Sequence, residues 1–123
     1  LLKNMAKDNI RFLGHVPNDR IPEIYGRHDV FILPSRYEPW GLVVEEALFR
    51  GLPVIASDKV GSAADMVAAL ETGAVFSLSA PDGLSNAIHE VEKNYETMAR
   101  RVADINWNSR VETQLKAYTS LLD

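Results

Sequence analysis

Short apolar runs recur along the chain, and stretches with helical spacing separate them. The runs are rich in β-branched residues and occupy residues 10–16, 29–33, 53–57 and 73–77. Their nearly continuous apolar character is typical of parallel strands that helices cover on both sides. The alternation therefore predicts an α/β fold, a Rossmann-like parallel sheet with helices on both faces.

Two helices are predicted in the first half of the chain. Asn18 and Asp19 offer an N-cap for a short helix that Gly26 ends, and its apolar face would hold Ile21, Ile24 and Tyr25. The second helix covers residues 41–50 and carries apolar side chains nearly all the way round. We expect this second helix to be buried.

Two further helices are predicted in the second half. Apolar residues keep helical spacing from residue 81 to residue 102, and Asn94 marks a point where this stretch could divide into two helices. The last helix covers residues 108–122, and Ser109 with Glu112 resembles a capping box at its start.

Composition narrows the functional classes. The chain has 123 residues and is 46% apolar, which predicts one domain over residues 1–123. Its 13 basic and 17 acidic residues leave a net charge of −4, so we expect no nucleic-acid partner. With no cysteine, the chain can hold no disulfide, thiolate nucleophile or cysteine-ligated metal.

The sequence suggests where the protein is located in the cell and that the chain is part of a longer protein. No apolar run approaches the roughly 20 residues that span a bilayer, no membrane contact is visible, and residues 1–5 show no signal-peptide pattern. We therefore expect a cytoplasmic protein. The chain opens on Leu1, and residues 1–7 resemble the tail of a helix, so we expect it to be a fragment of a longer protein.

The stretch P-S-R-Y-E-P-W-G-L-V-V-E-E-A-L, residues 34–48, leaves a predicted strand, crosses a loop and enters a helix. Ligands of parallel α/β sheets bind outside the carboxyl ends of the strands, where this loop must lie. Because Gly41 lacks a side chain, an anion could approach the backbone amides of Gly41, Leu42 and Val43 at the helix start. The alternative is that Gly41 merely permits a tight turn.

Two carboxylates flank this predicted phosphate seat, by which we mean the backbone amides of Gly41, Leu42 and Val43. Glu38 and Glu46 would lie about 12 Å apart in a continuous helix, beyond the ~5 to 9.5 Å of a glycosidase pair. Separated carboxylates can instead each accept hydrogen bonds from sugar hydroxyls, which suits a nucleotide-sugar. Structural alternatives are an ion pair of Glu46 with Arg50, a helix cap by Glu38, and packing of Trp40 on the core.

The stretch resembles the E-x7-E signature of retaining family 4 glycosyltransferases, in the variant E-P-W-G-L-V-x-x-E-A. Similarity continues through residues 11–17 and 51–57, through Thr72 and Gly73, and at Trp107, so it covers nearly the whole chain. The resemblance implies part of the C-terminal, donor-binding lobe of a GT-B glycosyltransferase, with the acceptor-binding N-terminal lobe of the same protein missing.

The resemblance also implies roles for individual residues. Glu38 is then the catalytic residue that touches the donor sugar, Glu46 holds the ribose, and the amides of Gly41, Leu42 and Val43 meet the diphosphate. It implies transfer from a nucleotide diphosphate sugar to an unknown acceptor with retention of configuration. No metal and no other cofactor is implied.

This chain departs from the family pattern in two places. The Lys/Arg pair that grips the diphosphate in relatives lies upstream of the first residue. The usual Gly-Gly-x-x-Glu segment is here Gly61-Ser62-Ala63-Ala64-Asp65, which puts an Asp in place of the Glu.

Other functions stay open at this point. One is a non-catalytic α/β nucleotide-binding or receiver-like signalling module, although the cluster of Asp residues that a receiver needs is not visible. Another is a different GT-B enzyme, such as an epimerase or a phosphorylase. His15, His28 and His89 show no ligand spacing, and we expect them on the surface.

Overall fold

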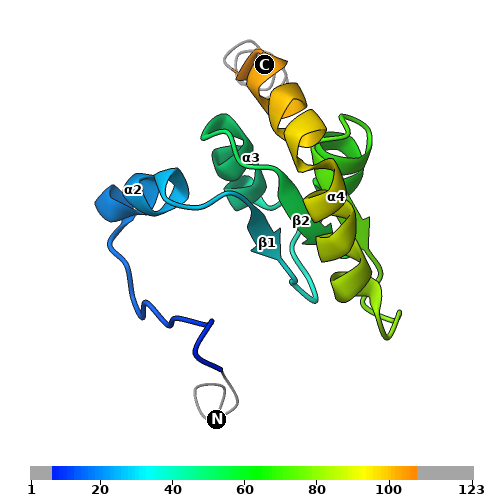
Figure 1. Cartoon of the computed structure of the whole chain (residues 1–123), viewed down its shortest axis with the longest axis horizontal. Helices are drawn as coiled ribbons and strands as arrows, with labels where there is room; N and C mark the ends of the chain where they lie inside the picture. Colours follow the sequence, from blue (N-terminus) through cyan, green and yellow to red (C-terminus); the bar gives the residue numbers. More distant parts are fainter. Residues whose placement is uncertain (1–6, 108–123) are drawn as a thin grey trace, which may run out of the picture.

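The structure, a computed structural model, describes residues 7–107. Its elements run in the order η1 (Asn18–Arg20), α2 (Ile21–Gly26), β1 (Phe31–Leu33), α3 (Leu42–Phe49), β2 (Val54–Ser57), η2 (Ala63–Ala68), β3 (Gly73–Phe76) and α4 (Gly83–Asp104). The strands form one parallel sheet in the order β1-β2-β3 (Figure 1), so three of the predicted strands are confirmed.

The central strand β2 explains why the sheet is covered on both faces. All of its residues are buried. Val54 and Ala56 pack into one apolar cluster with α3, whereas Ile55 packs into a second cluster with β3 and α4. Alternate side chains of a strand point to opposite faces, so a continuous apolar strand needs helices on both sides. The predicted α/β architecture is confirmed.

Helix α4 packs along the sheet through Ala87, Val91 and Met98. Asn94 leaves helical geometry, with φ −110° and ψ 18°, and its side-chain amide donates to the carbonyl of Glu90 at 2.9 Å. The break predicted at Asn94 is therefore confirmed as a kink. The predicted last helix at residues 108–122, with Ser109 and Glu112, lies outside the described residues.

The strand predicted at residues 10–16 is wrong. This segment is an exposed arm without regular structure, and Ile10, Phe12 and Leu13 are 54%, 46% and 52% exposed. Gly14 has a φ of +69°, which interrupts the extended backbone needed for a strand. An apolar run favours extended structure, but a strand also needs a pairing partner, and the arm pairs with none of the three strands.

Two details of the predicted helices are also wrong. No side chain caps η1 or α2, although Tyr25 is buried and Gly26 ends the helix as predicted. Helix α3 buries only one face, through Val44, Ala47 and Leu48. Its other face is open, with Leu42 67% exposed, Val43 36% and Phe49 50%.

Candidate functional site

The loop at residues 34–41 leaves β1 and enters α3 at the carboxyl end of the sheet, as predicted. It is joined to the loop that follows β2. Glu38 forms a parallel bridge with Val60: the Glu38 amide donates to the Lys59 carbonyl at 3.2 Å, and the Gly61 amide donates to the Glu38 carbonyl at 2.8 Å. The Ser62 amide adds a bond of 2.8 Å to the Trp40 carbonyl. The two loops therefore form one rigid unit.

Small residues make this close approach possible. A Cβ on Gly61 would lie 1.7 Å from the Pro39 carbonyl oxygen, a distance that no side chain tolerates, and 3.1 Å from the Trp40 Cα. The buried Ser57 hydroxyl donates to the Ser35 carbonyl at 2.5 Å and fixes the start of the loop. Sequence reasoning missed this second loop as a support, and the only signal for it was the glycine at position 61.

Gly41 is required where the loop becomes a helix. It lies at the N-cap of α3 with φ 88° and ψ 65°, a left-handed conformation that favours glycine. A Cβ here would lie 2.9 Å from Cγ1 of Val60 and 3.4 Å from both Cγ of Glu38 and Oγ of Ser62. Gly41 therefore does permit a tight turn, and the Glu38 side chain passes against the start of α3. A further role of Gly41 in binding an anion stays a prediction.

The backbone amides in the first turn of α3 are candidates for binding an anion. No side chain of the described residues caps this helix, so the alternative in which Glu38 caps it is wrong. The residues that follow Gly41 in this turn, Leu42 and Val43, are exposed. Free amides at a helix start attract anions because the helix dipole is positive there. Leu42 and Val43 are thus accessible and Gly41 is buried, and the phosphate role of their amides stays a prediction.

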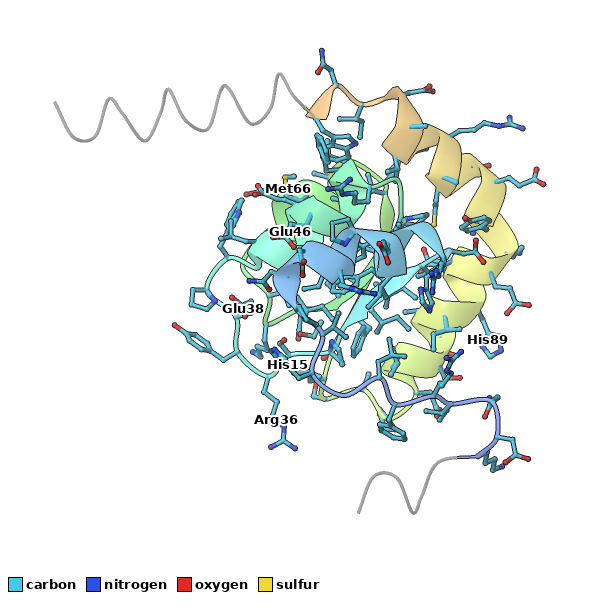
Figure 2. All side chains as sticks on the ribbon, turned by 90° about the vertical axis from the view of Figure 1, so that its left-hand side faces the viewer. His15, Arg36, Glu38, Glu46, Met66 and His89 are labelled. Carbon is cyan, nitrogen blue, oxygen red and sulfur yellow. The ribbon has the colours of Figure 1, made fainter. Side chains whose placement is uncertain are left out.

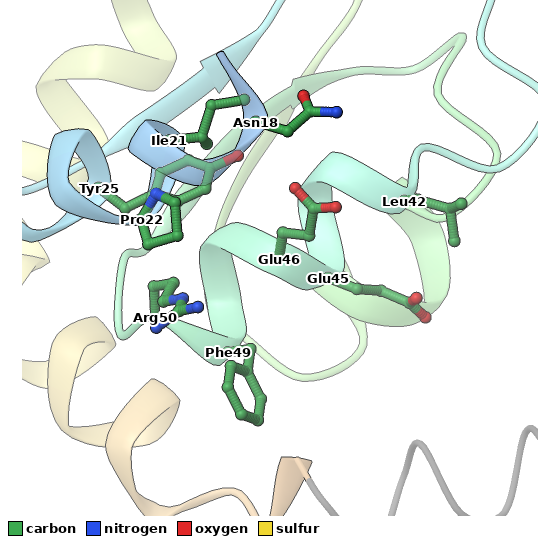
Figure 3. A pocket seen from close by; sticks show the side chains of 9 residues that line it. All are labelled: Asn18, Ile21, Pro22, Tyr25, Leu42, Glu45, Glu46, Phe49 and Arg50. Carbon is green, nitrogen blue, oxygen red and sulfur yellow. The ribbon is translucent and has the colours of Figure 1, made fainter. Parts of the chain in front are cut away.

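A cavity of about 570 Å³ lies between α2 and α3, next to this helix start. Figure 3 shows its walls, which include Asn18, Ile21 and Tyr25 on one side and Leu42, Glu46 and Phe49 on the other. Glu46 is exposed and lies within the cavity. The predicted site residue Glu46 therefore faces a space large enough to receive part of a ligand.

Tyr25 connects this cavity to the core. The residue is 9% exposed, and its ring packs edge-on against Phe31 of β1, with the ring centres 5.9 Å apart. Its hydroxyl group points toward the Glu46 carboxylate (Figure 3), and both side chains line the same cavity. Burial raises the pKa of Tyr25 above its ordinary value, and the negative charge of Glu46 nearby raises it further. The sequence predicted the buried ring but not that its hydroxyl faces Glu46.

The ion pair considered for Glu46 is not formed. No ion pair joins Glu46 to Arg50 in the described part of the chain, and the Arg50 guanidinium instead lies 5.8 Å from the centre of the Phe49 ring. Trp40 packs against the core as expected, and its indole donates to the Glu45 carboxylate at 3.3 Å.

The two predicted carboxylates lie on the same flank of the ribbon (Figure 2), Glu38 on the loop and Glu46 on α3. Their predicted separation stays a prediction. Among residues 7–107, no three acidic or histidine side chains gather in a metal-binding group. His15, His28 and His89 are exposed, as expected. No helix within the same residues is both long and apolar enough to span a membrane.

Comparison with known proteins identifies relatives. Residues 1–106 match the family of glycosyl transferases group 1. A GDP-mannose-dependent alpha-mannosyltransferase from Mycobacterium tuberculosis is 35% identical over 95 residues, which are 73% of this chain and 25% of that protein. Glycogen synthase from the same species is 28% identical over 116 residues, which are 88% of this chain and 28% of that protein.

A solved structure is also similar. The sucrose-phosphate synthase from Thermosynechococcus elongatus has a TM-score of 0.71 and 29% identity, and the match covers 98% of this chain and 32% of that one. The chain thus spans less than one third of the length of each of these three proteins.

Proposed function

The chain belongs to the group 1 glycosyl transferases, and we propose that it binds the nucleotide-sugar donor of a retaining sugar transfer. Its α/β fold is that of a lobe of a GT-B glycosyltransferase. The single observation that carries the proposal is the placement of Glu46 in a cavity beside the uncapped start of α3, with Glu38 packed against that start. The receiver-like alternative gains no support from the relatives.

In this proposal each part of the donor has its own partner. The diphosphate lies at the first-turn amides of Gly41, Leu42 and Val43, which donate hydrogen bonds and add the favourable end of the helix dipole. Glu46 accepts the ribose hydroxyls, and the nucleoside extends into the adjoining cavity of about 570 Å³. Glu38 contacts the donor sugar from the other side of the helix start.

The chemistry proposed for the lobe is positioning and charge stabilisation. Negative charge grows on the leaving diphosphate as the bond to the sugar breaks, and oriented amides stabilise it without reorganisation. We propose that this requires no metal and no further cofactor. The acceptor would approach from a lobe outside this chain, and the proposal leaves its identity open.

Calorimetry on the full-length protein tests the proposal. GDP-mannose is one donor to include, because a relative is named as dependent on it, and sugars carried on UDP and ADP complete the panel. We expect one base to be preferred, and the matching nucleoside diphosphate to compete with its sugar donor. If no nucleotide or nucleotide-sugar binds to the folded protein, the proposal is wrong.

A further inference from the structure

The Glu46 carboxylate lies on an open helix face, where an acidic side chain normally samples several rotamers. Glu46 is exposed, and the Arg50 guanidinium lies over the Phe49 ring rather than pairing with Glu46. An unrestrained glutamate loses rotamer entropy when it binds a ligand, and that loss weakens binding. A donor-binding role for Glu46 therefore calls for a group that holds the carboxylate in place.

Tyr25 is placed to do this. Its ring is fixed in the core by burial and by the edge-on contact with Phe31. Its hydroxyl end lies on the cavity wall opposite α3 and points across the cavity toward Glu46 (Figure 3). A phenol on a rigid ring is a donor whose position the fold determines, in contrast to the flexible acceptor that it faces.

We propose that Tyr25 is a positioning residue, which holds the Glu46 carboxylate toward the cavity for the ribose hydroxyls of the donor. This inference rests on the proposed role of Glu46. A carboxylate has about four acceptor sites, so it can accept the Tyr25 hydroxyl and still accept two ribose hydroxyls. Tyr25 itself does not need to touch the ligand.

Tyr25→Phe tests the inference, because it removes the hydroxyl and keeps the ring that packs on Phe31. We expect calorimetry on the full-length protein to show roughly three- to tenfold weaker binding, the loss typical of one hydrogen bond. The loss should be the same for the nucleoside diphosphate (GDP, UDP or ADP, whichever binds) and for its sugar donor. In turnover, KM for the donor should rise while kcat at saturating donor stays unchanged.

Tyr95→Phe is the matched control. Tyr95 is a partly buried tyrosine on α4 that packs against the second core cluster and lines no part of this cavity. We expect this variant to bind the nucleotides as the wild-type protein does. An equal loss in both variants would attribute the effect to general destabilisation and overturn the inference.

Glu46→Ala separates the inference from the proposed function. If Tyr25 acts through Glu46, adding Tyr25→Phe to Glu46→Ala should cost no further affinity. Weaker binding in Glu46→Ala with wild-type affinity in Tyr25→Phe would reject the role of Tyr25 and keep the proposed function. Wild-type affinity in Glu46→Ala would instead reject the ribose role on which both depend.

Discussion

Replacing Gly41 by alanine perturbs the point where the site loop becomes helix α3. Two costs are expected, one from the backbone and one from contact. The backbone cost arises because φ is 88°, a conformation that costs an alanine about 1–2 kcal/mol. The contact cost arises because the new Cβ would lie 2.9 Å from Cγ1 of Val60, which is only 3% exposed, so that relief of the contact must displace packed atoms.

Gly51 offers a control that carries only the first cost. Its φ is +92°, close to that of Gly41, and a Cβ there would meet nothing within 4 Å. Gly51→Ala should therefore lower the free energy of unfolding by about 1–2 kcal/mol. Gly41→Ala should lower it by about 1–3 kcal/mol more, the usual range for overpacking a core. The entropy that alanine removes from the unfolded chain is the same at both positions and cancels in the comparison.

Urea unfolding of the wild-type protein and both variants measures the two costs, and donor calorimetry follows the site. We expect Gly41→Ala to weaken donor binding, because relief of the contact moves Val60 or Glu38. Gly51→Ala should bind normally. Adding Val60→Ala to Gly41→Ala should remove the new contact and recover part of the affinity. Equal destabilisation by the two glycine variants would refute the contact argument.

Three further predictions concern the site. Glu46→Gln should weaken the binding of the nucleoside diphosphate and of the donor alike, by roughly 10- to 150-fold in calorimetry. Glu38→Gln should leave binding of the free nucleotide unchanged and lower turnover. Equal losses for both ligands in both variants would contradict the assigned roles. EDTA should leave donor binding unchanged, and loss of binding restored by Mg²⁺ or Mn²⁺ would refute the amide seat. The raised pKa of Tyr25 favours the folded state while the phenol is neutral. Stability should therefore fall as pH rises above about 10, and denaturant titrations of Tyr25→Phe should show a smaller fall.

The sequence predicts the sheet well because each of its strands depends mainly on local composition. Val54, Ile55 and Ala56 are apolar in succession, and such a run is typical of a strand that is buried on both faces. The segment with Phe12 and Leu13 has a similar composition, yet it is an exposed arm. The difference lies in strand pairing. Pairing depends on residues far away in the chain, so the composition of the run itself does not predict it.

The same limit applies to helix α3. Its apolar residues surround the axis, so the pattern predicts full burial, but burial also depends on which neighbours the fold supplies. Phe49 and Leu42 face the cavity between α2 and α3 and therefore stay exposed. The motif located Glu46 correctly on this helix. That its carboxylate shares a cavity with the Tyr25 hydroxyl follows from the packing of α2, which no local pattern encodes.

The E-x7-E motif is defined by its side chains, yet its geometry here depends on a second loop, residues 57–62, which contributes almost no side chains to the site. Residues 57–62 meet the loop of Glu38 mainly through backbone hydrogen bonds and through the missing side chain of Gly61, with the Ser57 hydroxyl also donating to the loop. Any larger residue at position 61 would push the Pro39 carbonyl away, and Glu38 would then move off the start of α3. The distance between Glu38 and the first-turn amides of α3 is therefore set by a residue that lies outside the motif and needs only to be small.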